Sequence, residues 1–581
     1  MKIKILALAA AAFLAPLLAS AQQQQPDYYA PPLDIPIYLS ANFGEIRTNR
    51  FHTGIDIKTQ GVVGKPLFAA ADGHIARVTV APGGYGRALY IAHPNGTTTV
   101  YAHMDRFTDE LESYLRAERL RLKRSDIDLF PDAARFPVRR GDRIGTAGNS
   151  GASGGPHLHF EVRNSADSRA LNVMPRGWIV TENPDDVPPR IVRLYHIDVD
   201  TLAGVPIHSR PRPYDVTKND DGSWSLVRTS PLKGGPTSYF VVEATDRRGD
   251  VTNTFGIHRA RLSIDGQERV VFEKDGVLFT HTRYACASVL YDVQRNSRNE
   301  AVMLALRSGN RLPMYKKAVE RGVVSFGENG ASKQIEITVE DDAGNISTLA
   351  FEVEPDLAHT PPPHPGGRIA SNRGDFVHSA DGLSVSIPRG ALYEPIFYTQ
   401  SVVEKTIAPR TDGIAPLSPI LRTGDGVQPL QSAMKLGIEA DIPENMRRRA
   451  CLARVSDSGG LSWSGGTYSN GSVNGTSRDF GTFCVVVDTT SPTVKSSFAE
   501  GADLSGSRTV TITATDNFSG IANFTGSIDG EWIVFERNAS RGQFVHRFDP
   551  ERLAAGTTHT FEFTCRDGAG NSSTWRGTFY K

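Results

Sequence analysis

The stretch "GPHLHFEV" (Gly155–Val162) places His157 and His159 two residues apart in an apolar run that is typical of a β-strand. Residues i and i+2 of a strand point to the same face, so both imidazoles should enter one pocket while the apolar residues between them turn away. Similar short runs with a period of two, broken by glycines and turn pairs, continue over roughly residues 31–183. This pattern predicts an antiparallel β domain.

One segment of this domain has a helical pattern instead. "TDELESYLRAERLRLKR" (Thr108–Arg124) carries its acidic residues early and its basic residues late. That order suits the helix dipole, so we expect a short helical insertion in the β domain.

The amino terminus has the features of a secretory signal peptide. Lys2 and Lys4 precede an apolar run that ends in the small residues Ala19-Ser20-Ala21. We therefore expect residues 1–21 to be removed and the mature chain to be exported, to the periplasm or the cell exterior. The apolar run is short for a membrane span, which needs about 20 residues, so no transmembrane segment is expected in the mature chain.

Length and charge limit the remaining possibilities. The chain has 581 residues, which is too long for a single hydrophobic core, and a formal net charge of zero. A balanced charge gives no general attraction to nucleic acid or to anionic membranes, so we expect no nucleic-acid partner. The four cysteines are too few for a disulfide scaffold. Export permits a bridge between Cys451 and Cys484, but the sequence is equally compatible with buried free thiols.

A weak internal repeat relates two regions downstream of the β domain. "ATDRRGD…SIDG" resembles "ATDNFSG…SIDG", and the turn at residues 341–345, "DDAGN", resembles "DGAGN" at residues 567–571. Short alternating strands with such turns predict two immunoglobulin-like (Ig-like) β-sandwiches, the first with an insertion around residues 284–325. A further β-rich region of uncertain type follows the Pro-rich linker "HTPPPHPGG". The acidic residues of these regions are scattered in turns, so we interpret all three as structural or interaction modules.

The candidate chemistry lies before residue 165. "RFHTGIDI" contains His52 and Asp56, and "TVYAHMDR" contains His103. Gly54 and the β-branched isoleucines on either side of Asp56 argue against a helix there and favour a turn that enters a strand. Two histidines and one carboxylate are a typical ligand set of catalytic zinc, which keeps a fourth position open. Such a metal lowers the pKa of water from about 15.7 towards about 7, and the remaining histidines could move protons.

The combined motifs resemble the M23 family, the lysostaphin/LytM-type zinc metallopeptidases of bacterial cell walls. The resemblance rests on H-x-x-x-D, Tyr-Ala-His-Met and Gly-x-His-Leu-His-Phe-Glu, and it covers roughly residues 35–175. It implies three zinc (Zn²⁺) ligands, His52, Asp56 and His159, and two catalytic histidines, His103 and His157. The long segment Phe107–Arg140 departs from simpler members, which have a short connection here, and it could restrict the groove or hold a partner.

The resemblance implies an exported zinc-dependent endopeptidase that hydrolyses the peptide cross-links of peptidoglycan. The alternative is a non-enzymatic cell-envelope scaffold, or an activator of another wall hydrolase, whose β-sandwiches bind an envelope protein or a glycan. Since the motifs end before Asn183, we expect a fragment of roughly residues 30–185 to fold alone and bind one zinc.

The predicted domains are the signal peptide (1–21), the M23 peptidase domain (22–185), an Ig-like β-sandwich with an insertion (186–357), a β-rich domain of uncertain type (358–489) and a second Ig-like β-sandwich (490–581).

Overall fold

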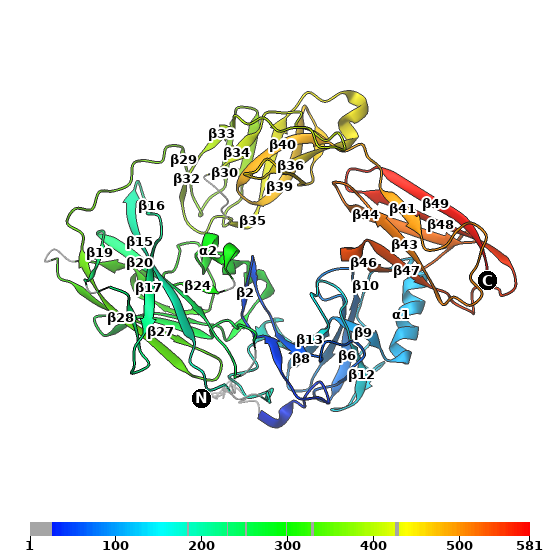
Figure 1. Cartoon of the computed structure of the whole chain (residues 1–581), viewed down its shortest axis with the longest axis horizontal. Coiled ribbons are helices and arrows are strands. Elements are labelled where there is room, and N and C mark those ends of the chain that lie inside the picture. Colours follow the sequence, from blue (N-terminus) through cyan, green and yellow to red (C-terminus); the bar gives the residue numbers. More distant parts are fainter. Residues whose placement is uncertain are drawn as a thin grey trace, which may run out of the picture.

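The structure is a computed structural model that describes residues 26–182, 185–228, 230–249, 252–297, 299–326, 330–424 and 429–581. The expected signal peptide, residues 1–21, lies outside these ranges. The regular elements of the described chain are mainly β-strands, which confirms the predicted fold class. Four groups of sheets follow one another around a ring, from the blue peptidase region through green and yellow to the red carboxyl terminus (Figure 1). Within the described ranges, no helix combines the length and the apolar character needed to cross a bilayer.

The predicted peptidase domain, called the peptidase domain below, is organised around one antiparallel sheet. Its central path has the order β1-β4-β13-β8-β7-β6-β10. The strands on this path are β1 (Leu39–Ala41), β4 (Ile55–Lys58), β13 (His157–Asn164), β8 (Thr97–Ala102), β7 (Arg87–Ala92), β6 (Gly73–Val80) and β10 (Ile127–Leu129). A smaller sheet joins β5 (Pro66–Phe68), β12 (Arg143–Ala147) and β9 (Met104–Phe107). Leu158 and Phe160 are fully buried in the core, as the alternation in β13 predicted.

The helical insertion forms where its charge pattern predicted it. Helix α1 (Asp109–Leu122) ends at Lys123, which adopts a left-handed conformation with φ of 50°. Leu111 and Leu115 are buried against the domain core. The helix therefore presents one apolar stripe inwards and leaves its charged residues for other contacts.

The next region, which we call the first β unit (residues 186–357), forms a sheet of 13 strands. Its path runs β24-β20-β15-β17-β18-β28-β27-β21-β22-β25. The main strands are β15 (Arg190–Leu202), β20 (Thr237–Thr245), β21 (Arg259–Ile264), β22 (Gln267–Glu273), β27 (Lys333–Glu340) and β28 (Ile346–Pro355). Between β22 and β27 lie the 3-10 helix η2 (Phe279–Ala287), helix α2 (Tyr291–Asn296), β24 (Glu300–Met303) and β25 (Tyr315–Ala318).

The peptidase domain has a core cluster of its own, but a few of its residues are buried in the core of the first β unit. Phe43, Ile46 and Phe51 are buried in the same cluster as Phe240 and other core residues of the first β unit. In addition, β14 (Ala170–Leu171) pairs with β23 (Gly276–Val277) across the boundary. The peptidase region therefore packs against the first β unit in addition to forming its own core.

Two larger sheets make up most of the middle β unit and of the last β unit. The middle β unit (residues 358–489) has two five-stranded sheets, with orders β30-β31-β35-β39-β38 and β33-β34-β40-β36-β37. The strands are β30 (Phe376–Ala380), β31 (Leu383–Ile387), β33 (Gln400–Val402), β34 (Leu421–Thr423), β35 (Pro429–Glu439), β36 (Ala450–Val455), β37 (Leu461–Trp463), β38 (Thr467–Ser469), β39 (Ser472–Asp479) and β40 (Gly481–Val487). Cys451 and Cys484 lie on the neighbouring strands β36 and β40 but are not opposite each other, and both are buried free thiols.

The last β unit (residues 490–581) packs a four-stranded sheet against a five-stranded sheet. The sheets have the orders β41-β43-β47-β46 and β42-β49-β48-β44-β45. The strands are β41 (Thr493–Ser496), β42 (Ala502–Asp503), β43 (Thr509–Thr515), β44 (Ile521–Ile528), β45 (Glu531–Trp532), β46 (Glu536–Asn538), β47 (Gln543–Arg547), β48 (Thr558–Asp567) and β49 (Ser572–Tyr580).

The ring closes where the last β unit meets helix α1 (Figure 1). Glu536 forms ion pairs with Arg119 of the helix, at 2.5 Å, and with Arg87 of β7, at 3.4 Å. The backbone N–H of Phe535 donates to Ser125 Oγ at 3.0 Å, just beyond the helix. The insertion that distinguishes this peptidase domain thus contacts another part of the same chain.

Candidate functional site

Three adjacent strands bring together all five site residues that the sequence predicted. Asp56 on β4 lies opposite His159 on β13, and Ala102 at the end of β8 lies opposite His159 on the other side. His103 follows β8 directly, and His52 precedes β4 in a turn, as expected. The register of the sheet therefore places these histidines and the aspartate, which are distant in the sequence, at one end of three neighbouring strands.

His52, Asp56 and His159 form a compact group that could hold a metal ion. His52 Nε2 lies 3.0 Å from Asp56 Oδ1 and 3.0 Å from His159 Nδ1, and His159 Nδ1 lies 2.9 Å from Asp56 Oδ1. Ligand atoms around a tetrahedral zinc with bonds of about 2.1 Å are about 3.4 Å apart. The three atoms thus need to separate by only a few tenths of an ångström to coordinate one ion.

The hydrogen bonds of the two histidines set their tautomers. His52 Nδ1 lies 2.7 Å from the carbonyl oxygen of Asn42, which can only accept, so this nitrogen carries the proton. His159 Nε2 likewise donates to Glu161 Oε1 at 2.8 Å. The lone pairs of His52 Nε2 and His159 Nδ1 therefore point towards each other and towards the carboxylate of Asp56. Three converging lone pairs repel one another unless a cation lies between them.

The electrostatics of the group agree with this geometry. Burial lowers the pKa of His52. Burial alone would also lower the pKa of His159, but its hydrogen bonds with Asp56 and Glu161 raise it to about 9. Burial would raise the pKa of Asp56, yet the surrounding histidines hold it well below its usual range. Without a metal, the group attracts a proton to the place where a cation fits.

Glu161 is a site residue that the sequence analysis missed. Its fully buried carboxylate accepts hydrogen bonds from His159, from Thr53 Oγ1 at 2.7 Å, from Tyr85 OH at 2.5 Å and from Arg163 Nε at 2.6 Å. A carboxylate behind a ligating histidine fixes the ring orientation and raises the basicity of the other nitrogen. Glu161 is two residues after His159 on the same strand, so the alternation that paired His157 with His159 also signalled it.

Asn42 connects the site to the first β unit. Its backbone carbonyl accepts the proton of His52, while its side-chain Nδ2 donates to the carbonyl of Gly256 at 2.8 Å and to Asp342 Oδ2 at 2.9 Å. The residue that orients His52 is therefore itself held by groups outside the peptidase domain. No motif in the sequence signalled this contact, because it depends on the packing of two distant segments.

His103 and His157 stand beside the metal-binding group. Their ring centroids are 4.7 Å apart, and His157 Nε2 lies 3.5 Å from Asp56 Oδ1. Each Nδ1 is 2.8 Å from a backbone carbonyl, that of Ser150 for His103 and that of Gly155 for His157. Because these Nδ1 atoms donate, each Nε2 is left as a proton acceptor. Burial and the two neighbouring histidines lower the pKa of His103 to about 4.

The backbone around the site is specialised at two positions. His103 has φ of 59°, a left-handed conformation that is uncommon for residues with a side chain and that clusters at functional sites. Gly54, between His52 and Asp56, passes so close to β13 that an added Cβ would lie 2.3 Å from the carbonyl oxygen of Phe160. Only glycine lets the turn approach the strand closely enough for His52 to reach His159.

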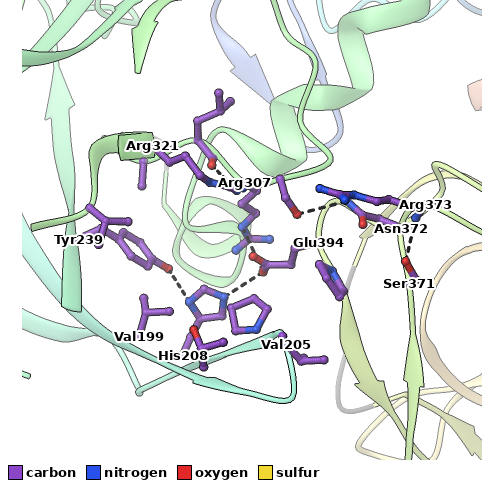
Figure 2. Close-up of a pocket in the computed structure, with 18 of the residues that line it drawn as sticks. Val199, Val205, His208, Tyr239, Arg307, Arg321, Ser371, Asn372, Arg373 and Glu394 are labelled. Carbon is purple, nitrogen blue, oxygen red and sulfur yellow. Dashed lines mark hydrogen bonds and ion pairs between the residues drawn. The ribbon is translucent and has the colours of Figure 1, made fainter. Parts of the chain in front are cut away.

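A cavity of ≈ 520 Å³ lies between the first and middle β units (Figure 2). His208 extends into it from β16 (Val205–His208), with Nε2 3.0 Å from Glu394 Oε1 and Nδ1 3.4 Å from Tyr239 OH. Arg307 Nε lies 3.7 Å from the same carboxylate oxygen. The charged groups here pair with one another, and none of the metal-binding groups found among the described residues lies in this cavity.

Comparisons with known proteins agree with the peptidase assignment. Residues 50–117 match the model of peptidase family M23, and residues 369–488 match the model of the Zu5-like domain, which identifies the middle β unit. The DD-carboxypeptidase/endopeptidase Mpg of Neisseria meningitidis is 37% identical over 118 residues, 20% of this chain and 21% of that protein. The peptidoglycan DD-endopeptidase ShyB of Vibrio cholerae is 31% identical over 111 residues, 19% of this chain and 20% of that protein.

A zinc-containing peptidase from Vibrio cholerae is similar among solved structures, at 26% identity over 26% of this chain and 39% of that chain, with a TM-score of 0.20. The chain spans about a fifth of the length of the curated relatives named above. The family match over residues 50–117 includes His52, Asp56 and His103. The amino-terminal region of this chain is therefore a domain of the M23 peptidase family.

Proposed function

We propose that the protein is an exported zinc endopeptidase that hydrolyses peptide cross-links of bacterial peptidoglycan. The observation that carries the proposal is the convergence of three lone pairs, from His52, Asp56 and His159, beside two further histidines. A site built only for structure would pair these groups with donors. The names of the related DD-endopeptidases support peptidoglycan as the substrate.

In this proposal His52 Nε2, Asp56 Oδ1 and His159 Nδ1 are the zinc ligands. When bound there, zinc would act as a Lewis acid on the scissile carbonyl and lower the pKa of a water molecule. Three protein ligands leave a coordination position open, which distinguishes catalytic from structural zinc sites. Asn42 and Glu161 hold the two ligating rings by their outer nitrogens.

His157 and His103 are the proposed proton carriers. Their Nδ1 protons are committed to backbone carbonyls, so each Nε2 is free to accept a proton from the attacking water or, once protonated, to stabilise the developing negative charge. The low pKa of His103 keeps its imidazole neutral at neutral pH, which is the form needed to accept a proton.

The test compares zinc content and cleavage for three variants of the mature chain. His159→Ala should lose zinc and activity together. His157→Ala and His103→Ala should retain near-stoichiometric zinc and lose about 10²–10⁴-fold in rate, the usual contribution of a positioned acid or base. Zinc is measured by elemental analysis, and cleavage by mass spectrometry of fragments released from defined muropeptides.

The outcomes separate the proposal from its alternative. Zinc loss in His157→Ala with retention in His159→Ala would show that the two roles are exchanged. A metal-loaded wild-type protein that never releases peptide fragments would contradict the enzyme and favour the scaffold or activator. Full activity in His157→Ala would make that histidine structural.

A further inference from the structure

Two clusters of aspartates occupy equivalent places in the two repeated β units. Asp185, Asp246 and Asp341 form one cluster, and in each cluster one oxygen from every carboxylate lies within 4.8 Å of the others. The second cluster consists of Asp488, Asp516 and Asp567. The acidic residues of these units are therefore not all scattered, as the sequence suggested, because strand pairing brings distant turns together at one end of each unit.

The two clusters share one architecture. In the first β unit, Asn345 Nδ2 donates to Asp341 Oδ2 at 2.8 Å and to the backbone carbonyl of Asp185 at 2.9 Å. In the last β unit the same two donations measure 2.8 and 2.9 Å. The residues that make them are Asn571, Asp567 and Asp488. The internal repeat has therefore kept a specific arrangement of three carboxylates, and not merely a turn.

Several of these carboxylate oxygens are buried and lack hydrogen-bond partners among the described residues. Asp246 is 1% exposed and neither of its carboxylate oxygens has a partner. Asp488 is fully buried and its Oδ2 has no partner, and Asp516 Oδ1 is also unpaired. Burying a charge without compensation is costly. Burial, together with Asp185 and Asp341, accordingly raises the pKa of Asp246 to about 8.

Neighbouring basic side chains neutralise these clusters only in part. In the first cluster, Arg248 Nε lies 3.4 Å from Asp185 Oδ2. In the last cluster, no ion pair joins any of the three aspartates to a lysine, arginine or histidine within the described ranges. Each cluster thus combines excess negative charge with oxygens that point at one another.

We propose that each cluster binds one Ca²⁺ ion. Calcium takes six to eight oxygen ligands at about 2.3–2.6 Å, so ligands on opposite sides of the ion lie about 5 Å apart. Three carboxylates with oxygens within 4.8 Å of one another fit this spacing. The donors are all oxygen, whereas zinc prefers nitrogen and sulfur, so these sites are chemically distinct from the histidine site.

The clusters lie at the junctions between units, where a bound ion would stabilise the connection. Asp185 lies in the segment that leads from the peptidase domain into β15, and Asp488 directly follows β40 of the middle β unit. The other two aspartates of each cluster lie at the end of a strand, or directly after one, in the unit that follows. An ion bound at either place ties a connecting segment to the next unit and fixes the angle between neighbours in the ring.

The experiment titrates Ca²⁺ into the zinc-loaded mature chain by calorimetry and records thermal unfolding with and without about 1 mM Ca²⁺, the range of extracellular calcium modules. We expect two ions per chain and a higher melting temperature. Asp246→Asn and Asp516→Asn should each bind one ion, and the double variant none. Asp220→Asn, in an exposed turn, is the matched control and should still bind two.

Folding defects do not obscure this test. Each Asp→Asn change removes a buried unpaired charge, so the calcium-free variants should unfold at or above the wild-type temperature. If a variant does not fold, the wild-type titration still decides. Absence of both binding and a calcium-induced stability shift in the wild type would overturn the proposal, as would two ions bound by the folded double variant.

Discussion

Replacing Glu161 by glutamine should separate metal affinity from folding. Glutamine has nearly the same shape but carries no charge, and one end of its amide can only donate. In the wild type the carboxylate accepts four hydrogen bonds, from His159, Thr53, Tyr85 and Arg163. At least one of these donors must therefore face the amide NH₂ group in Glu161→Gln.

Glu161→Gln should reduce both the zinc affinity and the stability of the fold, by different amounts. Mutation of a carboxylate behind a ligating histidine typically costs 10–100-fold in metal affinity, or about 1.4–2.8 kcal/mol. Arg163 is 7% exposed and would lose its buried counter-ion, and removal of one partner from a buried pair typically costs about 3–5 kcal/mol of stability. The variant should therefore be measurably less stable even when zinc is saturating.

A second change distinguishes the two effects. Arg163 packs over the rings of Tyr85 and Phe279, so methionine can keep much of its apolar contact. Glu161→Gln/Arg163→Met should regain most of the stability but not the zinc affinity. Competition with a chromophoric chelator measures the affinity, and urea denaturation measures the free energy of unfolding. Unchanged zinc affinity in folded Glu161→Gln would refute the role of Glu161 in orienting His159.

Three further predictions concern the rest of the chain. A fragment of residues 30–185 should melt at a lower temperature than residues 30–357, because the shorter fragment exposes Phe43, Ile46 and Phe51, which are buried in the core of the first β unit; equal melting temperatures would contradict this. Glu536→Arg places a third positive charge beside Arg119, so the radius of gyration from small-angle scattering should increase; an unchanged radius would show that the ring closes without these ion pairs. The pKa of Asp246 is about 8 in the folded protein and about 3.9 in the unfolded chain. The free energy of unfolding of the calcium-free, zinc-loaded protein should therefore fall as the pH rises from about 4 to 8. Urea denaturation measures this decline, and Asp246→Asn should flatten it.

The parts of the fold that the sequence predicted are those fixed by local patterns. Alternation in "HLHFEV" gave the strand and the shared face of its histidines, and the charge order of residues 108–124 gave helix α1. The candidate metal group could be predicted from the sequence because the short motifs contain histidines and an aspartate, which are seldom buried in a hydrophobic core. Glu161 obeys the same alternation and could have been included.

Other features depend on contacts that no local pattern encodes. Asn42 contributes a backbone carbonyl, which every residue possesses, so nothing in its side chain marked it as an orienting group for His52. The packing against the first β unit is similar, because Phe43 and Phe51 look like ordinary core residues of their own domain. The aspartate clusters were visible in the sequence only as similar turns in the two repeats. The pairing of the strands in the structure is needed to show that their carboxylates lie close together.

The first aspartate cluster is linked by covalent and hydrogen-bonded contacts to the peptidase site. Asp341 of the cluster precedes Asp342, whose carboxylate accepts a hydrogen bond from Asn42, and the carbonyl of Asn42 orients His52. The last cluster has no such chain of contacts among the described residues, so the two ions should differ in their effect on zinc. We expect Ca²⁺ at the first cluster to tighten zinc binding modestly, and Asp246→Asn, but not Asp516→Asn, to abolish that effect. Zinc titrations at fixed Ca²⁺ measure the coupling, which must be reciprocal if it is a true equilibrium linkage. Equal effects of the two variants would instead assign the coupling to closure of the ring.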